Sequence, residues 1–139
     1  MLAEFVGGAV QEIWKAVENR KVSFQQAEKQ VVGMDHAEVG ALLLERWRFP
    51  AALVESVRNH HRPEEATIDL TLSRISHLAD ALTMTMGMGL GVDGLAYVLD
   101  DRSLKALGLD RADRLDELLE ALVERIQQAD DVLRIARER

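Results

Sequence analysis

Three histidines and one aspartate are the polar residues best suited to chemistry in this leucine-rich sequence: His36, His60, His61 and Asp80. Three imidazoles and a carboxylate suit a borderline divalent metal such as Mn, Fe, Ni or Zn. Such a metal polarises a phosphoryl oxygen and activates water. The alternative is a satisfied polar cluster, in which neutral imidazoles hydrogen-bond to Asp80 and to backbone at helix ends. Spacing alone favours the polar cluster, so we expect no cofactor.

A third interpretation of the same residues is a site that binds a nucleotide or phosphate without turnover, with protonated histidine as donor. Other chemistries are not supported. The absence of cysteine excludes disulfides, a thiol nucleophile and a thiolate zinc site. The glycine-rich segment MGMGLGVDG has neither a preceding strand nor the GK[ST] of a phosphate-binding loop. The serines lack the context of a nucleophile elbow.

Composition indicates one domain, spanning residues 1–139, without nucleic-acid or membrane partners. The net charge of −7 argues against nonspecific binding to nucleic acid or anionic membranes. No apolar stretch is long enough to span a bilayer, and the N-terminus lacks the basic region of a signal peptide. We therefore expect a cytoplasmic protein. Only 4% of residues are aromatic, so Leu, Val and Ala must build the core.

The elements that position the four residues are expected to be helices, because proline occurs only twice and no strand-like alternation is evident. The first helix should run to about Arg20. Ser23 is expected to cap a second helix that stops near Gly33. Asp35 should cap the third helix, with Glu38 completing a carboxylate variant of the capping box.

Helical periodicity also predicts which faces are buried. One face of the third helix carries His36, Val39, Gly40, Leu43 and Trp47. After a tight break at Arg48–Phe49, the fourth helix begins at Pro50 and ends around His60–His61, because Pro63 disfavours the helical conformation before it. Its expected core face is Leu53, Val54 and Val57. The expected core stripe of the fifth helix is Ile68, Leu72, Ile75, Ala79, Leu82 and Met86.

Asp80 points away from that stripe by helical angle, so it needs a second packing surface, or water, to face the histidines. His77 falls on yet another side and is expected to be unrelated to the cluster. Short helices are expected from Asp93 to Leu99 and from Asp101 to Leu107.

The last helix is expected to run from about Arg111 to the C-terminus. Its apolar stripe comprises Leu115, Leu118, Leu119, Leu122, Val123, Ile126, Ala129, Leu133 and Ala136. Because its other faces alternate acidic and basic residues, it suits a partner helix better than a membrane. The fold class is thus all-α, a compact multi-helix bundle with a long C-terminal amphipathic helix.

Residues 33–63, GMDHAEVGALLLERWRFPAALVESVRNHHRP, resemble an HDOD domain. The pattern is a histidine opening a helix, G-x-L-L-x-x-W, a break at F-P, and a helix ending in HH; LSRISHLADAL continues it. The resemblance is strongest over residues 28–85. Only 35 residues precede His36, so the N-terminal part is abbreviated and the chain resembles the C-terminal part of such a domain.

HDOD domains are similar to the HD and HD-GYP metal-dependent phosphohydrolases, and His36, His60, His61 and Asp80 correspond by position to later ligands of that superfamily. The His–Asp dyad is missing, since only Asp35–His36 occurs, in reverse order, and no GYP follows His61. The resemblance implies a non-enzymatic bacterial signal-transduction module, acting through protein–protein interaction with other signalling proteins or domains. The alternative is a degenerate HD-type phosphohydrolase using those four residues. A homodimer formed by the first or last helix is also consistent with the sequence.

Overall fold

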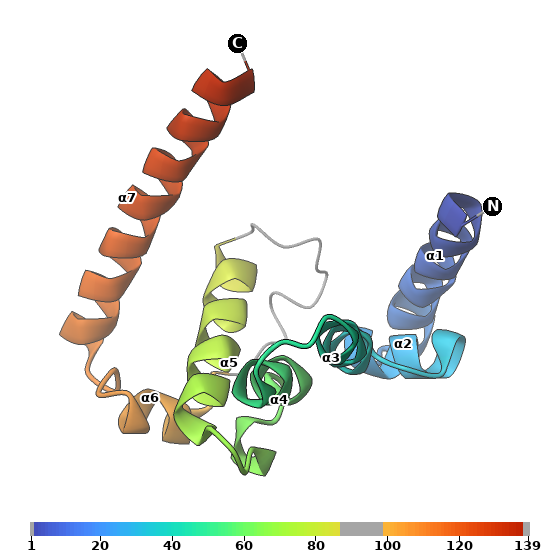
Figure 1. The fold of residues 1–139 in the computed structure, drawn as a ribbon, viewed down its shortest axis with the longest axis horizontal. Helices are drawn as coiled ribbons and strands as arrows, with labels where there is room; N and C mark the ends of the chain where they lie inside the picture. Colours follow the sequence, from blue (N-terminus) through green and yellow to red (C-terminus); the bar gives the residue numbers. More distant parts are fainter. Residues whose placement is uncertain (1, 87–98, 138–139) are drawn as a thin grey trace.

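The structure is a computed structural model that describes the backbone of residues 2–86 and 99–137 and the side chains of residues 8–86 and 99–129. Within these ranges the chain is helical and has no strand, which confirms the all-α class (Figure 1). The elements are α1 (Leu2–Arg20), α2 (Phe24–Val32), α3 (His36–Arg46), α4 (Ala51–Asn59), the 3₁₀ turn η1 (Pro63–Glu65), α5 (Leu70–Thr85), α6 (Asp101–Ala106) and α7 (Ala112–Arg137).

The glycine-rich segment and the short helix expected at residues 93–99 lie outside the described residues, except for Met86 and Leu99. None of the helices in the described part of the chain is long and apolar enough to cross a bilayer.

The first two helices form a pair with its own small core. That core consists of Ile13, Ala16, Val17 and Ala27. Ser23 caps α2 as expected, its hydroxyl accepting from the Gln26 backbone N–H at 3.2 Å. Gly33 ends the helix with φ of 87°, in the left-handed region that glycine enters without penalty.

The capping box of α3 fixes where the third helix starts. Asp35 Oδ1 accepts from the Glu38 backbone N–H at 2.8 Å, and Glu38 Oε2 accepts from the Asp35 backbone N–H at 3.0 Å. Asp35 is only 2% exposed, and its other carboxylate oxygen accepts from Gln25 at 2.8 Å and Lys29 at 3.1 Å. These bonds join α2 to α3 and make His36 the first residue of α3.

The buried face of α3 is not the face that periodicity predicted. Ala37 and Ala41 are buried, whereas Val39, Leu43 and Trp47 are 40%, 44% and 64% exposed. The reason is close packing on α4: a Cβ at Gly40 would lie 2.9 Å from Val57 Cγ1. Small residues allow this approach of the two helices, so the large side chains of α3 face outward.

The expected core face of α4 is also partly wrong. Leu53 is 39% exposed, and the buried residues are Val54, Glu55 and Ser56. Glu55 is buried because its carboxylate accepts hydrogen bonds from the backbone N–H groups of Thr67, Ile68 and Asp69, at 2.7, 2.8 and 2.9 Å. Those bonds hold the segment that enters α5.

The predicted stripe of α5 differs from the buried set, which is Ser73, His77, Leu78, Ala81 and Leu82. Ile68 and Ile75 are 61% and 48% exposed. The expectation that His77 is unrelated to the cluster was wrong. Its Nδ1 donates to the His60 carbonyl at 2.8 Å, and its Nε2 accepts from the Asp100 backbone N–H at 3.3 Å. It thereby links the end of α4 to the start of α6, so α5 is buried on the sides that face α4 and α6.

The central helices α3, α4 and α5 pack in succession, with α1 and α2 at one end (Figure 1). At the other end, α6 turns the chain into α7, which runs away from α5 and packs extensively on none of the other described helices.

Candidate functional site

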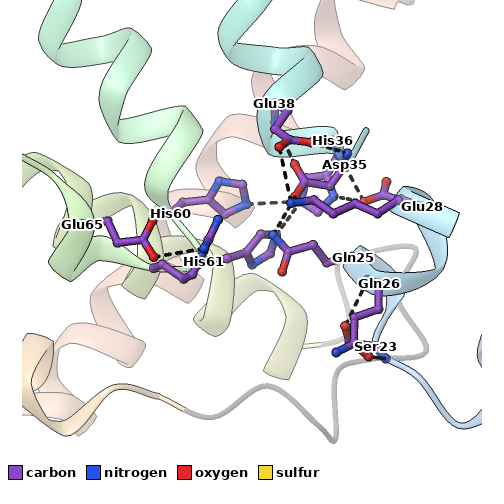
Figure 2. A network of polar contacts seen from close by, with 12 residues as sticks. Ser23, Gln25, Gln26, Glu28, Asp35, His36, Glu38, His60, His61 and Glu65 are labelled. Atoms are coloured by element: carbon purple, nitrogen blue, oxygen red, sulfur yellow. Dashed lines mark hydrogen bonds and ion pairs between the residues drawn. The ribbon is translucent and has the colours of Figure 1, made fainter. Parts of the chain in front are cut away.

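The three histidines of the sequence motif converge (Figure 2). His36 opens α3, His60 is the C-terminal cap of α4, and His61 follows it. His36 Nε2 lies 3.2 Å from His60 Nε2 and 2.8 Å from His61 Nε2. One ligand atom from each of the three lies within 4.8 Å of the others. The close packing of α3 on α4 at Gly40 is what brings the start of one helix to the end of the other.

Asp80 lies at the edge of this cluster. Its Oδ2 is 4.0 Å from His60 Nε2, beyond hydrogen-bond distance, and its side chain is 35% exposed. Asp80 was expected to need a second packed side of its helix in order to face the histidines. The contact between α5 and α4 provides that side. Asp80 therefore faces the histidines, but it does not join the group of converging ligand atoms.

Glu28 belongs to the site, although the sequence argument did not identify it. Its Oε2 accepts from His36 Nδ1 at 2.6 Å and from the His36 backbone N–H at 3.1 Å. The glutamate side chain is only 10% exposed. Gln25, Glu28 and Lys29 lie on one side of α2 at helical spacing, and all three reach the start of α3. That polar row on a short helix is the signal that points to Glu28.

Hydrogen bonds at the ring nitrogens orient the cluster. His36 Nδ1 donates to Glu28, and His60 Nδ1 donates to the Val57 carbonyl at 2.7 Å. His60 Nε2 is therefore left as an acceptor directed at His36. Imidazoles that donate one ring N–H to a carboxylate or carbonyl and direct the other nitrogen to a centre are typical of metal ligands.

The pKa values of His36 and His61 are shifted in opposite directions. The hydrogen bond that His36 donates to Glu28 raises the pKa of His36 against the effect of burial. Burial, followed by repulsion from His60 and His36, lowers the pKa of His61 to about 4. A protonated His36 can donate from Nε2 to neutral His61 and to His60, so the cluster is satisfied by its own hydrogen bonds. The Val57 carbonyl is a backbone partner of the kind expected for a polar cluster, but the carboxylate that accepts from an imidazole is Glu28 rather than Asp80.

The donor set also fits one divalent transition metal. Metal–nitrogen bonds of about 2.0–2.1 Å allow ligand nitrogens up to about 4.2 Å apart, and both measured separations are shorter. The three Nε2 atoms would hold the ion, after loss of the proton from His36. A bound ion would supply Lewis acidity and an activated water. The sequence contains no His–Asp dyad.

The comparisons with known proteins agree with this description. Residues 1–63 match the family model of the HDOD domain, which confirms the predicted family for that segment. The expectation that the chain resembles a C-terminal part was wrong, because the match lies in its N-terminal part. The matched segment contains all three clustered histidines and ends at Pro63, before Asp80. It indicates a regulatory or degenerate HD-related domain. No curated protein and no solved structure matches the chain.

Proposed function

We propose, from the HDOD domain at residues 1–63, that the protein is a non-enzymatic regulatory module of signal transduction that acts by binding another protein. The missing His–Asp dyad supports the non-enzymatic part of the proposal, because hydrolysis by two metals needs ligands on both sides of the ions. The outer face of α3 supports the protein-binding part.

That outer face is apolar and open to solvent. We call it the α3 face; it comprises Val39, Leu42, Leu43, Trp47 and Phe49, each between 40% and 64% exposed. The spacing of 39, 42, 43 and 47 places these side chains on one side of the helix, and the rings of Trp47 and Phe49 lie 6.5 Å apart. Contiguous exposed apolar patches mark interaction sites, and tryptophan is enriched among residues that dominate binding energy.

The turn after α3 holds these aromatic rings outward. Arg48 adopts φ of 59°, in the left-handed region that a residue with a side chain enters at a cost. The Phe49 backbone N–H returns to the Leu44 carbonyl at 3.0 Å and closes the turn. Arg46 and Arg48, both exposed, flank Trp47 in the sequence. The partner surface that fits best is therefore apolar with an acidic rim.

Site-specific photo-crosslinking tests the proposal. A photoreactive amino acid replaces Trp47, and in a matched variant it replaces Gln127 on the exposed side of α7. In cells that carry the protein natively, we expect a discrete crosslinked protein from position 47 and none from position 127. Equal labelling from both positions, or no adduct from position 47 in a folded variant, would reject the α3 face as the binding site.

A second candidate function is supported by the convergence of His36, His60 and His61: a degenerate HD-type phosphohydrolase with a single metal. In this function the imidazoles hold the ion, and Asp80 contributes a nearby negative charge. Elemental analysis of protein purified without chelator distinguishes the candidates. Stoichiometric Mn, Fe, Ni or Zn that is lost in His60→Ala/His61→Ala would favour the phosphohydrolase, whereas protein free of these metals would favour the polar cluster.

A further inference from the structure

The apolar stripe of α7 follows a seven-residue repeat. Apolar residues alternate at spacings of three and four along the whole helix, at Ala112, Leu115, Leu119, Leu122, Ile126, Ala129, Leu133 and Ala136. A period of 3.5 residues is the pattern of a coiled-coil seam, and it continues here for more than three heptads. The helix spans 26 residues, or about 39 Å, which is long enough for a stable two-stranded contact.

Within residues 2–86 and 99–137, the seam packs extensively on no other helix. Among the described residues, α7 makes no extensive contact with another helix, and Figure 1 shows it running away from α5. Leu115, Leu119, Leu122 and Ile126 are only partly covered, and Val123 beside them is 39% exposed. We propose that the α7 seam pairs with α7 of a second copy of this chain, as a parallel, in-register coiled coil.

The residues that flank the seam support a second copy in parallel orientation. In a parallel pair, the residue just before seam position 119 or 126, the first of the two seam positions in each heptad, lies opposite the residue five places later in the partner. Arg125 then lies opposite the register position of Asp130 of the partner subunit. This pairing of opposite charges occurs twice, because the two copies are related by symmetry. Leu118 lies opposite the partner subunit's Val123, so apolar residues also meet.

An antiparallel pair with full overlap does not have this complementarity. Its seam would centre between positions 122 and 126, so Arg125 would meet its own copy, and Asp116 would lie opposite the register position of Asp130 of the partner subunit. Both contacts place like charges together, which disfavours the arrangement. The sequence of α7 thus specifies an orientation as well as a seam.

Sedimentation equilibrium on the full chain tests the association. We expect a dimer for the wild type, a monomer for Leu122→Glu, and an unchanged dimer for Gln127→Glu on the opposite side of α7. Arg125→Glu should weaken the dimer roughly tenfold, and Arg125→Glu/Asp130→Arg should restore it. A monomeric wild type, or a dimer that survives Leu122→Glu, would overturn the proposal.

Cysteine crosslinking tests the orientation, because the chain has no cysteine of its own. In a parallel pair, Ala129→Cys meets its own copy and should form an intermolecular disulfide on mild oxidation, whereas Gln127→Cys should not. In the antiparallel pair, position 129 lies opposite position 119, so a dimer without the Ala129→Cys crosslink would overturn the parallel arrangement. The inference does not depend on the α3 face: rejection of that face by crosslinking at Trp47 leaves the dimer untouched.

Discussion

Glu28 binds His36 at two places: one carboxylate oxygen lies 2.6 Å from the imidazole Nδ1 and 3.1 Å from the backbone nitrogen. The contact joins α2 to the first residue of α3. The orientation of the His36 side chain is therefore set by α2 and does not depend on the histidines at the end of α4. The contact also raises the pKa of His36.

Nuclear magnetic resonance titration should show the His36 imidazole protonating at a higher pH than the His61 imidazole. The pKa of His36 is raised, chiefly by the hydrogen bond to Glu28, while burial and the neighbouring imidazoles lower that of His61 to about 4. Glu28→Gln should lower the pKa of His36. A wild-type His36 that titrates at or below its ordinary value would contradict the assigned contact.

The pKa shifts of His36 and His61 make the free energy of unfolding depend on pH in opposite directions. Protonation of His36 stabilises the fold below its ordinary pKa near 6.5, and this contribution is lost as pH rises through the raised value. His61 must stay neutral, so its contribution is lost as pH falls from about 6.5 towards about 4. Denaturant unfolding between pH 4 and 6.5 should show that the free energy of unfolding of the wild type falls as the pH is lowered. The fall should be smaller in His61→Gln.

Gly40 should be intolerant of a side chain. A Cβ at this position would meet Val57 Cγ1 at 2.9 Å, and a β-branched side chain has little freedom to move away. We expect Gly40→Ala to lower the free energy of unfolding by about 1–3 kcal/mol. The matched control is Gly8→Ala in α1, where a Cβ meets nothing within 4 Å, and there alanine should be neutral or stabilise by up to about 1 kcal/mol.

Thermal unfolding of the two variants checks this prediction, and Val57→Ala in the Gly40→Ala background should recover part of the loss. If Gly40→Ala stabilised the protein as Gly8→Ala does, the close approach of α3 and α4 would be wrong, and with it the geometry of the histidine cluster.

The Gly40 contact also explains where sequence reasoning succeeded and where it failed. Helix starts were predictable because caps are local: Ser23 and Asp35 each bond to a backbone group three residues on. The buried faces could not be predicted in this way, because burial depends on which other helix packs against a face. Periodicity favoured Val39, Leu43 and Trp47, whereas the buried residues of α3 are Ala37 and Ala41. The close approach of α3 to α4 is at Gly40.

The candidate site shows the same division. The convergence of His36 with His60 and His61 agrees with the grouping made from the motif. Glu28 was missed because its partner lies eight residues away, across a helix boundary that no single periodicity spans. His77 was set aside as unrelated, yet it bonds the His60 carbonyl, because α5 returns to the end of α4 through a turn whose geometry is not local.

Glu55 predicts a separate acid sensitivity. Burial would raise the pKa of its carboxyl, but hydrogen bonds from the backbone of Thr67, Asp69 and Ile68 prevail and lower it to about 2. Since the ordinary value is 4.5, the stability contributed by Glu55 is present above that pH and is lost as pH falls towards 2.

Denaturant unfolding between pH 4 and pH 2 lies below the range of His61. Comparison with Glu55→Gln separates the effect of Glu55 from that of Asp35 and Asp100, whose pKa values are also lowered. Glu55→Gln should be less stable than wild type at pH 7 and should lose less stability on acidification. Glu120→Gln, on an exposed side of α7, is the matched control and should follow the wild-type curve. A wild-type curve no steeper than that of Glu55→Gln would contradict the role of the carboxylate.

Hydrolysis assays should give no turnover that depends on the histidines. Because the His–Asp dyad is missing, protein supplied with Mn²⁺ or Zn²⁺ should hydrolyse cyclic dinucleotides and phosphomonoesters no faster than His60→Ala does. Metal-dependent turnover that His60→Ala abolishes, with the fold of that variant intact by circular dichroism, would establish the phosphohydrolase instead.

The exposure of Trp47 separates binding from stability. At 64% exposed, its removal should cost less than about 0.5 kcal/mol of folding free energy, whereas Leu78→Ala in the core should cost about 2–5 kcal/mol. Thermal unfolding of the two variants provides the check that any loss of binding by Trp47→Ala is not a loss of fold.

The central claim is that this protein binds a partner through its α3 face. The most direct test identifies the partner captured by photo-crosslinking at position 47. Its affinity for the wild type and for Trp47→Ala is then measured by titration calorimetry. If the α3 face carries the function, Trp47→Ala should weaken binding by roughly 30-fold or more, while its melting temperature stays close to that of the wild type. Equal affinity for the two proteins would contradict the claim that this module works through its α3 face.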